Sequence, residues 1–375
     1  MTSFKASSCH SLNGIIKVPG DKSISHRSIM LGSIANGVTN VSGFLEGEDS
    51  LATLRAFQQM GVQIERTGSN ITIHGVGKHG LKSSSEPFDL GNSGTSIRLM
   101  SGLLSAQSFN SQLCGDESLS KRPMARVIEP LSMMGAIIDS YESKPPLSIT
   151  GNQKLSAINY TLPVASAQIK SCLLLAGLYA EGETCIVENS TTRDHTERML
   201  RGFGYPVNSS KGQISLMGGD ELHACDIEVP SDISSAAFFI VAASIAKEAD
   251  ITLNAVNINP TRTGILNILD LMGANITLTN ERVVASELVA DIRVCSAELR
   301  GINIPQELIP LAIDEFPVIF VAASCATGET LLTGAKELRV KESDRIQVMA
   351  DGLTVLGIEN KVLEDGIRIQ GGEFS

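Results

Sequence analysis

Apolar residues along the chain follow two periods, one typical of helices and one typical of strands. In the stretch 265–272 they recur at i, i+3, i+4 and i+7, which places them on one face of a helix. Gly273 follows at once, where a left-handed glycine commonly ends a helix. The same helix-ending phrase occurs as FQQMGVQI (57–64), LSMMGAII (131–138), LRGFGYPV (200–207), LDLMGANI (269–276) and LTVLGIEN (353–360).

Short alternating strands, each closed by glycine, follow most of these phrases: NITIHG (70–75), PLSITG (146–151), QISLMG (213–218) and GIRIQG (366–371). In a second phrase, a strand ends in proline and a polar loop opens a helix of small residues, as in IIKVPGDKSISHRSIML, NYTLPVASAQIKSCLLL and DIEVPSDISSAAFFIVA. Together they predict an α/β unit, β-loop-α-β-loop-α-β-β, with copies roughly 70 to 85 residues apart. A sixth copy would fall beyond residue 375.

The loops that open these helices are rich in serine, aspartate and cations. Lys22, Ser23 and Arg27 surround a helix start expected near Ser23, and such a start binds phosphate or carboxylate well. N-capping alone explains any single loop, but a cation beside each cap favours anion binding. Corresponding loops hold Gly91 and Gly94, Arg122, Ser166 and Gln168, and Arg193 with His195. For His195, a capping or core position is favoured over a general base.

The segment 336–345, KELRVKESDR, is the densest run of charge in the chain. A solvated helix face would explain such a run. Leu338 and Val340 alternate with the charges, however, which predicts a strand leading into a helix start. Upstream, Asp314 interrupts an apolar stretch, where a carboxylate needs a partner or a role.

Composition narrows the class of protein. The 375 residues suggest two or three domains, and 42% apolar with 19% charged residues is typical of a globular protein. A net charge of −11 and the lack of tryptophan argue against global nucleic-acid binding. The seven cysteines form no C-x-x-C pair, which predicts reduced thiols and no metal cage. No signal peptide or membrane-length apolar run is seen, so we expect a cytoplasmic protein.

Seven phrases occur in the order known from one enzyme family: GDKSISHR (20–27), GNSGTSIR (91–98), SLSKRPM (118–124), ASAQIKS (165–171), RDHTERML (193–200), IDEFP (313–317) and ELRVKESDR (337–345). The chain therefore resembles the 5-enolpyruvylshikimate-3-phosphate synthases over its whole length. The resemblance implies a two-domain inside-out α/β barrel of βαβαββ repeats, with helix N-termini facing an interdomain cleft that closes on substrate. Residues 22–230 would form one domain, and 1–21 plus 231–375 the other, with five repeats recognisable and a sixth missing at the C-terminus.

The implied reaction transfers the enolpyruvyl group of phosphoenolpyruvate to the 5-hydroxyl of shikimate 3-phosphate and releases phosphate, without metal or cofactor. Its chemistry requires proton transfer at the hydroxyl and at C3 of the enol. By resemblance, Asp314 would accept the hydroxyl proton, Glu342 would carry the C3 proton and Lys22 would stabilise developing charge. Lys341 and Arg345 favour the carboxylate form of Glu342, whereas burial would favour the acid.

The resemblance also assigns the ligands of the two substrates. Shikimate 3-phosphate would be held by Lys22, Ser23, Arg27, Ser166, Gln168, Arg193, Asp314 and Lys341. Phosphoenolpyruvate would contact Lys22, Gly94, Arg122, Gln168 and Arg345. Glycine at position 94 would leave room for the inhibitor glyphosate, and the protein is expected to act as a monomer.

Two alternatives stay open at this point. The UDP-N-acetylglucosamine enolpyruvyl transferases share fold and donor but place a loop cysteine just before an Arg-Pro; Cys114 lies too far from Arg122 to match and is interpreted as a small buried residue. The other alternative is an impaired form that still binds shikimate 3-phosphate. The family continues with an Asp-His-Arg phrase and a late lysine, and losing two charged ligands at ~1.5–3 kcal/mol each would weaken phosphoenolpyruvate binding.

Overall fold

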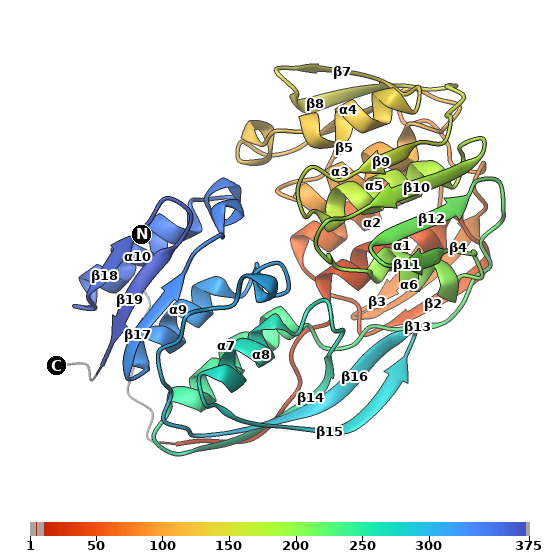
Figure 1. Cartoon of the computed structure of the whole chain (residues 1–375). Helices are drawn as coiled ribbons and strands as arrows, with labels where there is room; N and C mark the ends of the chain where they lie inside the picture. Colours follow the sequence, from red (N-terminus) through yellow and green to blue (C-terminus); the bar gives the residue numbers. More distant parts are fainter. Residues whose placement is uncertain (1–4, 6–10, 373–375) are drawn as a thin grey trace. The chain divides into compact units, whose positions relative to one another are not determined.

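The computed structural model describes residue 5 and residues 11–372, which form two compact units (Figure 1). Unit 2 comprises Pro19–Pro230 and Val284–Glu287, and unit 1 takes the chain up to Val18, Ser231–Val283 and the chain from Leu288. The sequence placed the first crossing after residue 21, three residues later than the structure does. It also assigned 284–287 to the other domain. Cys9 lies outside the described residues.

Unit 2 contains three four-stranded sheets with one shared strand order. The first is β13 (Ile227–Glu228), β2 (Asn36–Ser42), β4 (Asn70–Val76) and β3 (Gln63–Thr67). The second is β5 (Phe88–Asp89), β6 (Ser111–Cys114), β8 (Lys144–Thr150) and β7 (Ile137–Tyr141). The third is β9 (Asn159–Thr161), β10 (Glu183–Val187), β12 (Gln213–Met217) and β11 (Asn208–Ser210). In each sheet the first pair is parallel and the other pairs are antiparallel.

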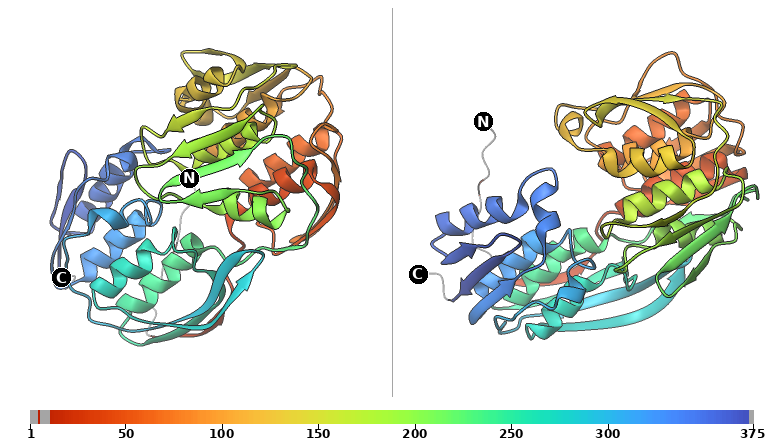
Figure 2. Two further views of the ribbon diagram at one scale, coloured as in Figure 1. Left: turned by 45° about the vertical axis from the view of Figure 1, so that its right-hand side comes forward. Right: turned by 45° about the horizontal axis from the view of Figure 1, so that its top comes forward.

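Two helices accompany each of these sheets. They are α1 (Lys22–Ile34) and α2 (Glu48–Gln59), α3 (Gly94–Leu104) and α4 (Ala125–Met133), and α5 (Ala167–Gly177) and α6 (His195–Gly202), with a 3-10 turn at Leu119–Lys121. Helix α3 packs along α5 (Figure 2). The side chains of α1 from Ile24 to Ile34 are all buried, which is why its sequence mixes apolar residues with small serines instead of showing a polar face.

Unit 1 repeats this order with fewer paired strands. One sheet is β1 (Leu12–Ile16), β14 (Ala249–Asn257), β16 (Glu287–Cys295) and β15 (Asn275–Val284); the other is β17 (Gly328–Leu332), β19 (Ile367–Gly371) and β18 (Asn360–Val362). Isolated parallel bridges join Arg300 to Thr327 and Asn303 to Leu331 at the edge of the second sheet. The helices are α7 (Ile233–Ile245), α8 (Gly264–Leu271), α9 (Phe316–Cys325) and α10 (Arg345–Val355), with 3-10 turns at Gln306–Leu308 and Lys336–Val340.

Glycines are required by the backbone in both recurring motifs, at the ends of the helices and at the ends of the alternating strands. All five helix-ending glycines have positive φ, between 78° and 100°, as the sequence predicted: Gly61, Gly135, Gly204, Gly273 and Gly357. The strand-closing glycines meet backbone instead. A Cβ on Gly75 would lie 2.2 Å from the Ala35 carbonyl oxygen, and one on Gly371 would lie 2.1 Å from that of Ala326. Each strand can therefore cross the end of its helix only without a side chain.

Each unit has its own hydrophobic core. The unit 2 cluster runs from Ile24 to Val229, and the unit 1 cluster contains Val18 and residues from Ile233 to Ile369. Over the described residues, no helix is long and apolar enough to cross a membrane. Nor does that part of the chain contain a group of three His, Cys, Asp or Glu side chains placed to hold a metal ion. The six cysteines that are described are all free thiols.

Candidate active site

The start of α1 carries the first group of predicted ligands. Asp21 caps this helix by accepting a hydrogen bond from the Ile24 amide at 2.9 Å, so the helix begins at Lys22, one residue before the expected start. The Lys22 ammonium forms a close ion pair with Asp49, in the first turn of α2. Ser23 follows in the first turn of α1 and is half-buried. This ion pair therefore joins the N-terminal ends of α1 and α2 at the predicted anion site.

Arg27 lies one turn further along α1 and is 5% exposed. It donates three hydrogen bonds, all to neutral oxygens: Nε to Thr196 Oγ1 (2.7 Å), Nη1 to the Ser23 carbonyl (2.9 Å) and Nη2 to Ser171 Oγ (2.8 Å). Burial lowers the pKa of Arg27 to about 10, although the charge of Glu197 raises it. A buried guanidinium held by hydroxyl and carbonyl groups keeps charge available for an anionic ligand.

Gly94 begins α3 and lies between two guanidinium groups. A Cβ at this position would be 2.8 Å from Arg98 Nη1 and 2.9 Å from Arg122 Nη1. Arg98 Nη1 donates to Gln168 Oε1 at 3.0 Å, and Arg122 Nη2 donates to Asn92 Oδ1. The structure thus groups three of the predicted phosphoenolpyruvate ligands of unit 2, namely Gly94, Arg122 and Gln168, around Arg98.

The remaining unit 2 residues of the predicted site lie at the N-terminal ends of α5 and α6. Ser166 caps α5, where its hydroxyl accepts from the Ile169 amide at 3.4 Å. Gln168 Nε2 donates to Thr95 Oγ1 at 3.1 Å. Arg193 precedes α6, and its positive charge contributes to the lowered pKa of Arg27, which places two cations near one another.

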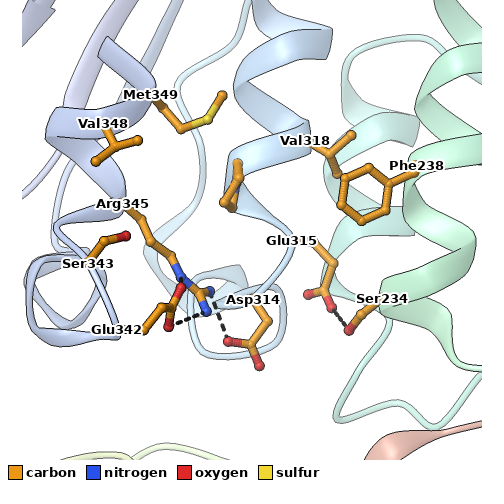
Figure 3. A pocket seen from close by; sticks show the side chains of 11 residues that line it. Ser234, Phe238, Asp314, Glu315, Val318, Glu342, Ser343, Arg345, Val348 and Met349 are labelled. Carbon is orange, nitrogen blue, oxygen red and sulfur yellow. Dashed lines mark hydrogen bonds and ion pairs between the residues drawn. The ribbon is translucent and has the colours of Figure 1, made fainter. Parts of the chain in front are cut away.

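In unit 1, Arg345 joins both predicted proton carriers (Figure 3). Its Nε and Nη2 bond the two carboxylate oxygens of Glu342 at 2.9 and 3.0 Å, and its Nη1 bonds Asp314 Oδ1 at 3.1 Å. These groups line a cavity of about 330 Å³, with Phe238 and Met349 among its apolar residues. Burial alone would lower the pKa of Arg345, but the hydrogen bond and charge of Glu342 and the charge of Asp314 raise it above its usual value.

The predicted strand in segment 336–345 is wrong. Residues Lys336–Val340 form a 3-10 turn, a bend follows through Lys341 and Glu342, and α10 begins at Arg345 behind its N-cap Asp344. Leu338 is buried but Val340 is 57% exposed, so the two alternating apolar residues do not share one buried face as they would in a strand. Arg345 donates two hydrogen bonds to the carboxylate of Glu342, an arrangement that favours the charged form of this side chain.

Several residues of these groups escaped the sequence-based prediction. Arg98 stands four residues after Gly94 and donates to its carbonyl at 3.2 Å, so the helical spacing alone could have indicated it. Asp49 had no local signal. Glu315, next to Asp314, is buried and receives a hydrogen bond from Ser234, and Arg262 lies 3.7 Å from its carboxylate.

The surroundings of His195 and Cys114 do not favour a chemical role for either residue. His195 is fully buried, with its Nδ1 2.7 Å from Glu287 Oε1, which agrees with the core interpretation. Cys114 ends β6 and is only partly buried, so the expectation of a buried residue was too strong. Burial and the charge of Asp89 raise the pKa of its thiol, which disfavours a reactive thiolate.

Comparisons with known proteins agree on one family. A family model described as EPSP synthase (3-phosphoshikimate 1-carboxyvinyltransferase) matches residues 7–375. Two proteins named 3-phosphoshikimate 1-carboxyvinyltransferase are similar: that of Ruthia magnifica is 69% identical over 100% of this chain and 86% of its own length, and that of Hydrogenovibrio crunogenus is 62% identical over 98% and 84%. These names do not favour either alternative function.

The fold has a solved counterpart. A structure of EPSP synthase from Acinetobacter baumannii superposes with a TM-score of 0.87 and 59% sequence identity, over 97% of this chain and 84% of that one. At this identity the mixed α/β architecture described above is shared with that enzyme. The chain therefore spans 84–86% of the length of the relatives named here.

Proposed function

Since the chain belongs to the EPSP synthase family, we propose that it is the transferase that joins the enolpyruvyl group of phosphoenolpyruvate to the 5-hydroxyl of shikimate 3-phosphate and releases phosphate. This step belongs to the shikimate pathway of aromatic amino-acid biosynthesis. The observation that carries the proposal is Arg345, which holds the proposed hydroxyl base Asp314 and the proposed C3 proton carrier Glu342 in one cavity.

The reaction needs proton carriers whose charge state changes during turnover. Asp314 and Glu342 both bond Arg345, which favours their carboxylate forms before substrate binds. Arg345 is itself a proposed phosphoenolpyruvate ligand. When the donor's anionic groups compete for its guanidinium, Glu342 loses part of this stabilisation and its affinity for a proton rises. Donor binding thus prepares Glu342 to deliver a proton to C3 while the hydroxyl attacks C2 and Asp314 accepts the hydroxyl proton. Glu342 then takes a proton back from C3 as the C2–O bond to phosphate breaks, which re-forms the double bond and releases phosphate.

Unit 2 supplies cations for the other ends of the substrates. Arg27 and Arg193 act on the 3-phosphate of shikimate 3-phosphate, and Lys22 stabilises charge that develops as the tetrahedral intermediate forms. The proposed ligands of shikimate 3-phosphate are Lys22, Ser23, Arg27, Ser166, Gln168, Arg193, Asp314 and Lys341. Those of phosphoenolpyruvate are Lys22, Gly94, Arg122, Gln168 and Arg345.

Four further features belong to the same proposal. Both units are parts of an inside-out α/β barrel made of βαβαββ repeats, as the shared strand order of the sheets suggests. Residues 22–230 and 1–21 plus 231–375 correspond to its two domains, close to the bounds of the two units. The protein works in the cytoplasm. It works as a monomer.

A phosphate-release assay tests the function directly. The purified chain, with its intact mass checked on the same sample, is given phosphoenolpyruvate with either shikimate 3-phosphate or UDP-N-acetylglucosamine. We expect phosphate release only with shikimate 3-phosphate. Release with the nucleotide sugar alone, or binding of shikimate 3-phosphate without any release, would contradict the proposal.

A further inference from the structure

Lys170 is a lysine of α5 that is 1% exposed and that the proposed chemistry does not use. Its ammonium lies 2.8 Å from Glu197 Oε1 and 3.0 Å from Glu188 Oε2, and both carboxylates are almost fully buried. It also donates to the carbonyl oxygen of Thr192 at 3.4 Å. Burying three charged groups carries a desolvation penalty that their attraction need not repay. We therefore looked for a role of this cluster other than stability.

The cluster of Lys170, Glu188 and Glu197 is connected to Arg27 through the residues next to it in the sequence. Ser171, next to Lys170, and Thr196, next to Glu197, are the two hydroxyls that accept hydrogen bonds from Arg27. The charge of Glu197 is the largest favourable charge acting on Arg27. Within the part of the chain that the structure describes, Arg27 nevertheless bonds only neutral oxygens, while Oε1 of Glu197 bonds Lys170. Lys170 and Arg27 are thus two cations in the field of one buried carboxylate.

We propose that Lys170 is a positioning residue that holds Glu197 and thereby keeps Arg27 available to the phosphate of the substrate. This inference rests on the proposed function, because it assumes that Arg27 binds shikimate 3-phosphate. Without the ammonium, the guanidinium of Arg27 is a cation that Glu197 can bind instead, since the charge of Glu197 already raises the pKa of Arg27. A carboxylate bound there competes with the phosphate for the same N–H groups.

The same lysine fixes the loop before α6. Glu188 accepts from Lys170 and, at 2.7 Å, from the hydroxyl of Thr192, so both ends of the loop are tied to α5. Arg193 is the next residue. Lys170 therefore also helps to place the loop that leads to Arg193, while its proposed effect on substrate affinity acts on Arg27 through Glu197.

The test compares variants in the whole chain by calorimetric binding of shikimate 3-phosphate and by steady-state kinetics. For Lys170→Met we expect the dissociation constant and the KM of shikimate 3-phosphate to rise at least tenfold, with kcat at saturation within threefold of wild type. The double variant Lys170→Met/Glu197→Gln removes the competing charge and should regain most of the affinity. Lys78→Met is the matched control, because Lys78 is also buried in unit 2 but bonds the carbonyl oxygen of Leu178.

The possible outcomes distinguish a failure of the proposed role of Lys170 from a failure of the proposed function. Wild type that neither binds nor converts shikimate 3-phosphate refutes the proposed function. Wild type that does both, beside a folded Lys170→Met with unchanged affinity, refutes the role of Lys170. A double variant as weak as Lys170→Met also refutes it, since the carboxylate that is proposed to compete for Arg27 is then absent. If Lys170→Met does not fold, a folded double variant decides alone: affinity within threefold of wild type supports the role, and a tenfold loss overturns it.

Discussion

Gly94 is the residue whose lack of a side chain has the most direct consequence. A methyl group there would press on the guanidinium ends of Arg98 and Arg122, which are flexible and can move aside. For Gly94→Ala we expect little loss of stability. The KM of phosphoenolpyruvate should rise about tenfold or more, because a displaced charged hydrogen bond costs ~1.5–3 kcal/mol. Inhibition titrations should show a similar rise in the inhibition constant of glyphosate.

A matched change controls this prediction. Gly352 lies in α10, and a Cβ there would meet nothing within 4 Å, so Gly352→Ala should leave both constants unchanged. Equal glyphosate inhibition constants for wild type and Gly94→Ala would show that the guanidinium groups do not define the donor site.

Glu342 provides the second prediction at the scale of one residue. Removing its carboxylate in Glu342→Ala takes away the proposed C3 proton carrier, and general acid–base catalysis is worth typically ~10²–10⁴-fold in rate. We expect kcat to fall by that order while the affinity for shikimate 3-phosphate largely survives, as measured by steady-state kinetics and calorimetry. The exposed carboxylate in Glu359→Ala serves as control. An unchanged kcat in Glu342→Ala would remove Glu342 from the mechanism.

At the scale of elements, a buried chain of hydroxyls connects the starts of three helices. His26 of α1 lies with its Nδ1 2.8 Å from the hydroxyl of Thr53 in α2, which in turn lies 2.6 Å from that of Ser96 in α3. Ser93, the N-cap of α3, bonds Ser96 at 2.6 Å. Short polar side chains therefore connect the helices that carry Lys22, Asp49 and Gly94, in addition to the ion pair between Lys22 and Asp49.

His26, at one end of this row of hydrogen-bonded side chains, makes the stability of the protein depend on pH. Burial, together with the charges of Lys22 and Arg27, lowers the pKa of His26 from 6.5 to about 3, against the opposing charge of Asp21. Between these values the unfolded chain binds a proton at His26 and the folded chain does not. The free energy of unfolding should therefore fall as pH drops from 6.5 toward 3, by up to about 1.4 kcal/mol per pH unit from this group.

Urea unfolding at a series of pH values measures that slope. His26→Gln removes the titrating group, so its stability should depend less on pH than that of wild type over the same window. His79→Gln is the control, because His79 is exposed. Identical slopes for wild type and His26→Gln would mean that His26 does not stay neutral in the folded protein.

For the molecule as a whole, the two cores share no residue. A cavity cut in one core should therefore weaken that unit first. Leu103→Ala in unit 2 and Leu269→Ala in unit 1 both replace fully buried leucines, and such changes cost about 2–5 kcal/mol. Hydrogen exchange read by mass spectrometry should show faster exchange in the unit that carries the cavity. Equal loss of protection in both units would indicate a single cooperative core.

Much of the architecture could be predicted because its signals are local. The five helix-ending glycines and the alternating strands each depend on a few neighbouring residues, and all five glycines have the expected left-handed φ. Local alternation failed where a 3-10 turn imitates a strand, at Leu338 and Val340. It also gave no hint that Val284–Glu287, which includes the turn between β15 and β16, belongs with unit 2. The carboxylate of Glu287 meets His195 across 92 positions of sequence.

The sequence by itself determined the family and the kinds of charge at the predicted sites, because ordered motifs and residue types are properties of the chain. Only the tertiary structure decided which charges neutralise one another. Arg345 bonds two carboxylates, whereas Arg27 bonds none among residues 11–372. The carboxylate of Glu197, whose charge also acts on Arg27, instead bonds Lys170. The energy of an ion pair depends on the distance between its charges in the folded protein and on how far they are buried, and neither quantity can be obtained from the order of residues alone.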